Sequence, residues 1–71
     1  MARILYEIVV RGAVATAIMN ELVGFEVVST GRRGTVMRGW VTDQSALLAI
    51  LNRLGSFGLE LDSVEPVNAL H

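Results

Sequence analysis

The segment that most constrains the fold runs from residue 43 to residue 58, because its start, its buried face and its end can all be inferred. Asp43 suits the N-cap position, where its carboxylate can accept a backbone N–H of the first turn. Gly58 suits the left-handed conformation that follows many helices. Apolar side chains recur between them at three- and four-residue spacings: Leu47, Ile50, Leu51, Leu54 and Phe57. The pattern predicts an amphipathic helix whose apolar face must be buried against another element.

Alternation of apolar and polar residues predicts four β-strands, over residues 4–11, 25–30, 35–42 and 59–64. In the first strand Tyr6, Ile8 and Val10 share a wholly apolar face. The stretch Gly31-Arg32-Arg33-Gly34 has a glycine at each edge and favours a tight hairpin between the second and third strands. Pro66 ends the fourth strand, because proline cannot donate to a strand ladder.

A second, sparsely polar helix is predicted over residues 13–23, from the spacing of Val14, Ala17, Ile18 and Leu22. With right-handed crossovers, the order β-α-β-β-α-β gives a four-stranded antiparallel sheet in spatial order 4-1-3-2, backed on one face by two helices. This is the α+β ferredoxin-like two-layer sandwich, a name that refers here to topology alone. Seventy-one residues suffice for a single domain spanning 1–71, which would be marginally stable by itself.

Composition argues against several classes of function. There is no cysteine, and the one histidine, His71, lies at the end of the chain, so we expect no metal and no cofactor. A net charge of −1 lacks the basic footprint of a nucleic-acid binder, and the open sheet face carries one aromatic residue, Trp40, where RNA-binding sheets stack bases on several. Apolar runs of four or five residues are far shorter than the ~20 needed for a membrane span. Glu7 interrupts any secretory signal, so a cytoplasmic location is expected.

The chain resembles a family of small uncharacterised bacterial proteins over nearly its whole length. The resemblance is carried by Tyr6-Glu7-Ile8-x-Val10-x-Gly12, Gly34-Thr35-Val36-x-x-Gly39, Asp43-Gln44-x-Ala46-Leu47 and Leu54-x-x-Phe57-Gly58-Leu59-x-Leu61. It implies the ferredoxin-like topology and transfers no catalytic residue. The family usually has histidine where Leu48 stands and often has charged residues at Gly55 and Ser56, so this member has the less polar surface.

The acidic residues do not form an obvious catalytic pair, and no histidine lies inside the chain. Glu60 and Asp62 are two residues apart on the predicted fourth strand and therefore share a face. Charges on an edge strand discourage aggregation between sheets, and this role is sufficient to explain both carboxylates. We therefore expect a protein that is not an enzyme.

The face of the sheet that no helix covers is the first candidate site. It is expected to hold Leu5, Val9, Val28, Val36, Arg38 and Trp40, and its apolar members are expected to form a contiguous patch. Patches of this kind usually mark interfaces, so the sequence predicts a homo-oligomer or a protein partner. The alternative is a monomer with a solvated sheet.

The second candidate is a corner of the sheet that would bind a small anion or an amino acid, as regulatory ACT modules do at a similar place in the topology. This site, which we call the arginine corner, comprises Arg11, Gly12, Ala13, Arg32 and Arg33. Backbone N–H groups at a helix N-terminus and nearby arginines together favour carboxylate or phosphate. Ordinary turn chemistry is the more frequent explanation for two arginines in a hairpin.

Overall fold

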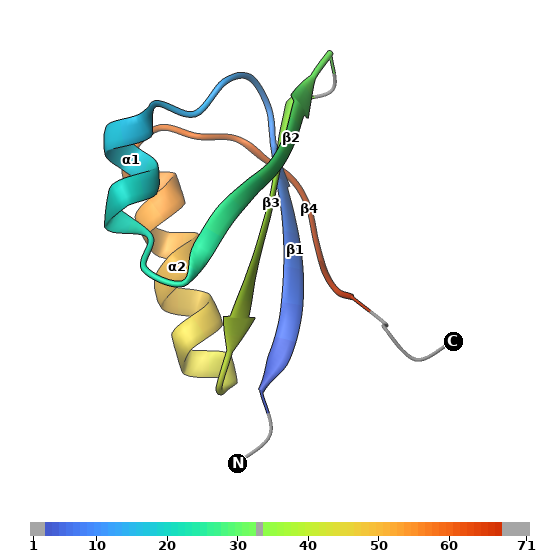
Figure 1. The fold of residues 1–71 in the computed structure, drawn as a ribbon. Helices are drawn as coiled ribbons and strands as arrows, with labels where there is room; N and C mark the ends of the chain where they lie inside the picture. Colours follow the sequence, from blue (N-terminus) through green and yellow to red (C-terminus); the bar gives the residue numbers. More distant parts are fainter. Residues whose placement is uncertain (1–2, 33, 68–71) are drawn as a thin grey trace.

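The computed structural model describes residues 3–32 and 34–67, which form one layer of helix on one layer of sheet (Figure 1). In chain order the elements are β1 (Ile4–Val10), α1 (Thr16–Glu21), β2 (Phe25–Gly31), β3 (Gly34–Val41), α2 (Gln44–Ser56) and β4 (Leu61–Pro66). The sheet has the order β2-β3-β1-β4, and every neighbouring pair of strands is antiparallel. The predicted ferredoxin-like topology and strand order are confirmed.

Both helices lie on the same side of the sheet, and the core fills the space between the two layers (Figure 1). The buried apolar side chains are Ile8, Val10, Leu22, Phe25, Met37, Val41 and Leu54. They come from three strands, from α2 and from the end of α1. The opposite side of the sheet, which we call the open face, has no helix over it among the described elements.

The ends of α2 are those predicted. The side-chain Oδ1 of Asp43 accepts a hydrogen bond from the Ala46 backbone N–H at 2.8 Å, so the N-cap is formed. Gly58 has a φ of +79°, and the following residue, Leu59, donates its N–H to the carbonyl of Leu54 at 3.2 Å. Leu54 is fully buried against the sheet. Because capping and periodicity agree, this helix could be predicted almost to the residue.

The prediction for α1 was too long. Residues 13–23 were expected to be helical, but the helix covers only Thr16–Glu21. The residue before it, Ala15, is extended and offers no side-chain cap, and Gly12 has a φ of +79°. Without a capping side chain the helix starts late, and an ion pair between Glu21 and Arg53 of α2 joins the two helices.

The prediction for β4 was displaced by two residues. It was expected over 59–64 and instead covers Leu61–Pro66. Leu59 cannot join the strand because its N–H completes the end of α2. The ladder with β1 shifts register between Val9 and Val10, and Pro66 is accepted at the last position of this edge strand, opposite Tyr6. Glu60 therefore lies outside the strand, so Glu60 and Asp62 are not the two strand neighbours that were predicted.

The hairpin between β2 and β3 is confirmed, with Gly31 paired to Gly34. Gly34 has a φ of +124°, and a Cβ at this position would collide with the carbonyl oxygen of Val10. Beside it, the buried Thr35 donates its hydroxyl to the carbonyl of Gly12 at 2.8 Å. These contacts hold the hairpin against the end of β1.

Candidate functional site

The pairing of β1 with β3 arranges the open face in three rows across the strands. The rows are Leu5 beside Trp40, Glu7 beside Arg38, and Val9 beside Val36. Directly paired residues of antiparallel strands share a face, so these side chains stand next to one another. Leu5, Val9 and Val36 are half-buried by their neighbours, whereas the Trp40 side chain is strongly exposed.

The middle row continues into both edge strands and is charged throughout. Glu26 of β2 pairs with Arg38, and Glu65 of β4 pairs with Glu7. The guanidinium of Arg38 holds Glu7 with its Nε and one terminal nitrogen, each 2.9 Å from Oε1. We call Glu26, Arg38, Glu7 and Glu65 the charged row.

The charged row divides the apolar side chains, so the expected contiguous patch is wrong in this respect. Side chains on one face of a strand are two residues apart, and Glu7 therefore lies between Leu5 and Val9. On β3, Arg38 separates Val36 from Trp40 in the same way. The open face has two apolar rows with an ion pair between them.

Trp40 and Val28 are the most exposed of the predicted interface residues. Trp40 is 53% exposed, and the guanidinium carbon of Arg3 lies 5.3 Å from the centre of its ring system, a cation–π contact. Val28 is 50% exposed and falls where the ladder shifts register between Val27 and Ser29. The bulge leaves Val28 without a direct partner on β3, so it stands beside the rows rather than in one of them.

The arginine corner differs from its prediction because α1 begins late. Gly12 and Ala13 are exposed and precede the helix, which starts at Thr16, so their amides do not belong to its first turn. The guanidinium of Arg11 lies 3.9 Å from the carboxylate of Glu60, and both side chains are largely in solvent. Arg11 thus already has an acidic neighbour.

The hairpin contributes one described arginine to this corner. Arg32 is exposed in the turn, and Gly34 is pressed on the backbone of Val10 and Arg11, so the turn does reach the end of β1. Arg33 lies outside the described residues. What the structure brings together here is Arg11 and the base of the hairpin, while Gly12 and Ala13 lie outside α1.

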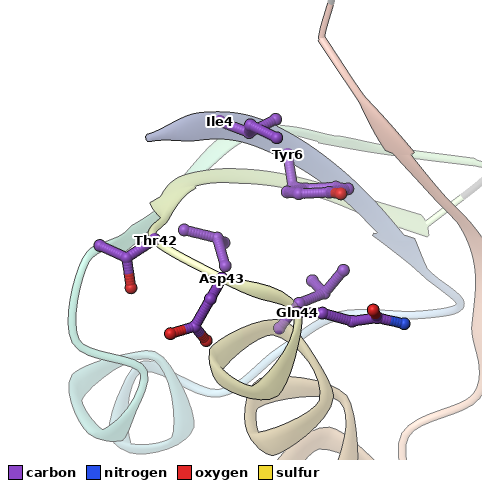
Figure 2. Close-up of a pocket in the computed structure, with 7 residues that line it drawn as sticks. Ile4, Tyr6, Thr42, Asp43 and Gln44 are labelled. Atoms are coloured by element: carbon purple, nitrogen blue, oxygen red, sulfur yellow. The ribbon is translucent and has the colours of Figure 1, made fainter. Parts of the chain in front are cut away.

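A pocket that the sequence did not indicate lies at the other end of the sheet, between the strands and the start of α2 (Figure 2). Its volume is about 260 Å³, and it is lined by Ile4, Tyr6, Val41, Thr42, Asp43, Gln44 and Leu47. The carboxylate in its lining belongs to Asp43 and accepts the Ala46 amide as the helix cap. The inward position of Tyr6 and the capping role of Asp43 were both predicted, but their proximity depends on packing between elements.

Within residues 3–32 and 34–67, no group of three or more His, Cys, Asp or Glu side chains is placed to hold a metal ion. Neither α1 nor α2 has the length and apolar character required to cross a bilayer.

The chain is therefore a small α+β domain of ferredoxin-like topology with one sheet face that no described element covers, and on this face a charged row lies between two apolar rows. Residues 5–65 match the family model described as Domain of unknown function (DUF8691), and the chain belongs to that family. The match agrees with the inferred resemblance to an uncharacterised family. Comparison with curated proteins and with solved structures found no match.

Proposed function

We propose that the protein is a non-catalytic interaction module that binds protein through its open face. The observation that carries the proposal is the exposed Trp40 beside Leu5, with a second apolar row of Val9 and Val36, on a face that no described element covers. Tryptophan is among the residues that most often dominate interface energies. A protein partner would remove this surface from water.

The gain from such a contact is large relative to the stability of a chain of this length. Full burial of a large apolar side chain contributes about 1.5–3 kcal/mol, and a small domain has only about 5–15 kcal/mol of folding stability in total. Burying Trp40 and its row in an interface would therefore stabilise appreciably a fold that is marginal at this length.

The charged row favours protein over nucleic acid as the occupant. Three carboxylates, those of Glu7, Glu26 and Glu65, cross the middle of the face, and the one cation among them, Arg38, is already paired with Glu7. Phosphate backbones are attracted by uncompensated Lys and Arg. A protein can instead offer apolar side chains to the outer rows and polar groups to the middle row.

The alternative function, binding of a small anion or amino acid at the arginine corner, has less support. The helix amides on which it depended lie elsewhere, and Arg11 faces Glu60. We therefore favour the open face as the functional surface.

The proposal is tested by photo-crosslinking in the cells that make the protein. A photoreactive phenylalanine analogue replaces Trp40 in one variant and Leu48 in the other. Leu48 is a matched control because it is exposed to a similar extent, 51% against 53%, but lies on α2, across the sheet from the open face. Position 40 should give a discrete protein adduct and position 48 should not. Equal labelling at both positions, or no adduct at position 40, would contradict the proposal.

A further inference from the structure

We propose that the occupant of the open face is a second copy of this chain, related to the first by a two-fold axis that runs parallel to the strands between β1 and β3. This inference rests on the proposed function and specifies its partner. It comes from the middle of the three rows, which has a glutamate on β1 and an arginine on β3.

A half-turn about such an axis exchanges β1 with β3 and leaves every position along the strands unchanged. Each row then lies on the same row of the other copy. Trp40 packs on the partner's Leu5, and Leu5 packs on the partner's Trp40. In the other apolar row, Val36 packs on the partner's Val9. Apolar side chains therefore meet apolar side chains in the two outer rows of the central pair of strands, as in two sheets packed face to face.

The charged row is self-complementary under the same rotation. Arg38 faces the partner's Glu7, and Glu7 faces the partner's Arg38, so the ion pair already present in each chain becomes a cluster of two cations and two anions. At the rim, Glu26 lies toward the partner's Glu65. Both residues lie on edge strands and are exposed in the single chain, and like charges at a solvated rim repel each other only weakly.

The other way to stack two copies of this face uses an axis perpendicular to the strands, and the charges disfavour it. That axis would place each strand over itself, with Arg38 on the partner's Arg38 and Glu7 on the partner's Glu7. Its apolar rows would still meet, because the Trp40 row would lie on the Val36 row. Only the charged row separates the two arrangements, and like charges brought together in an interface are strongly unfavourable.

The test exchanges the two central charges in the variant E7R/R38E. The intrachain pair is kept with its direction reversed, and the net charge is unchanged. The charged row also keeps one attractive and one repulsive contact with the edge strands. In the natural chain the residues at positions 26 and 38 attract each other, and those at positions 7 and 65 repel each other. In the variant, positions 26 and 38 repel each other and positions 7 and 65 attract each other. The variant should therefore fold, which is checked by its circular dichroism spectrum and its urea midpoint.

Isotope-labelled natural chain and unlabelled variant are each analysed alone and after mixed refolding, by native mass spectrometry. Each chain alone should form a dimer, because the opposite charges still face each other across the axis. A mixed dimer would place the natural Arg38 on the arginine introduced at position 7, and the natural Glu7 on the glutamate introduced at position 38. It should therefore be about tenfold rarer than random pairing predicts. Labelled natural chain mixed with unlabelled natural chain provides the control and should pair at random.

The other outcomes overturn the inference in distinguishable ways. Random mixing of natural chain and variant would show that the charged rows do not face each other. Preferential mixing would show the perpendicular axis. A natural chain that stays monomeric at high concentration would exclude the second copy as occupant, while the crosslink at position 40 would still decide whether another protein binds the open face. An adduct absent at position 40 despite dimer formation would refute the proposed function and, with it, the inference that rests on it.

Discussion

At the scale of single residues, Gly39 has a role that the sequence pattern did not reveal. It lies on β3 directly between Phe25 of β2 and Tyr6 of β1, on the helix side of the sheet. A Cβ at Gly39 would lie only 2.5 Å from two ring carbons of Phe25 and 2.6 Å from the carbonyl oxygen of Gly24. Because Gly39 has no side chain, the Phe25 ring can pack over it in the core, and Phe25 as a residue is only 8% exposed. Sequence shows the glycine, but only the cross-strand register shows what covers it.

Replacing Gly39 with alanine should therefore destabilise the protein, by about 1–3 kcal/mol, because the Phe25 ring and the Gly24 backbone must both move. The matched control is Gly55→Ala in α2, where nothing lies within 4 Å of the new Cβ. That change should raise stability by about 0.5–1 kcal/mol, since alanine favours the helix. Urea unfolding of both variants measures the two effects. Equal stability of the Gly39 and Gly55 variants would contradict the predicted clash of the new Cβ with Phe25 and Gly24.

At the scale of elements, α2 could be predicted from the sequence because three independent local signals agree: a capping carboxylate at Asp43, an apolar stripe and Gly58 after the last turn. The other helix has an apolar stripe alone, and without a capping side chain it is shorter than the stripe suggests. The start of β4 depends on the end of α2, which takes Leu59 out of the strand. Boundaries set by local chemistry were therefore predictable, and those set by competition between neighbouring elements were not.

The Asp43 cap should contribute measurably to stability. Asp43→Ala removes the acceptor of the Ala46 N–H and should lower the free energy of unfolding by about 1 kcal/mol, within a range of about 0.5–2 kcal/mol. Asp43→Asn keeps a side-chain oxygen at the same place and should retain most of this stability. The measurement is the urea midpoint of each variant. A loss as large in the asparagine variant would show that the charge, rather than the hydrogen bond, stabilises the helix.

At the scale of the whole molecule, the sequence predicted which residues share the open face but not their arrangement. Alternation along each strand is local, so Leu5, Val36 and Trp40 could be placed correctly. The charged row depends on how four strands are aligned, and two of its members, Glu26 and Glu65, belong to edge strands that contain a register shift. The pocket beside Tyr6 was missed for the same reason, because it exists only where separate elements pack together.

Self-association through the open face predicts stability that depends on protein concentration. The melting temperature should rise by about 3–6 °C for each tenfold increase in concentration, because the dimer is favoured by mass action. Trp40→Thr, which keeps a residue suited to strands, should abolish the dependence, whereas Leu48→Gln on α2 should preserve it. Trp40 is the one tryptophan of the chain, so its emission should also shift to shorter wavelength as the dimer forms. A melting temperature independent of concentration in the natural chain would contradict self-association.

The antiparallel pairing of β1 with β4 makes the two ends of the proposed dimer different from each other. Tyr6, near the start of β1, lies opposite Pro66, the last residue of β4, while the β2–β3 hairpin projects at the far end of the sheet (Figure 1). An axis parallel to the strands keeps this direction in both copies. The starts of β1 and the ends of β4 then gather at one pole, and the two hairpins with their exposed Arg32 side chains gather at the other. A domain joined to the chain at either terminus would therefore lie beside the same domain of the other copy. The opposite pole, with the two Arg32 side chains, would stay accessible.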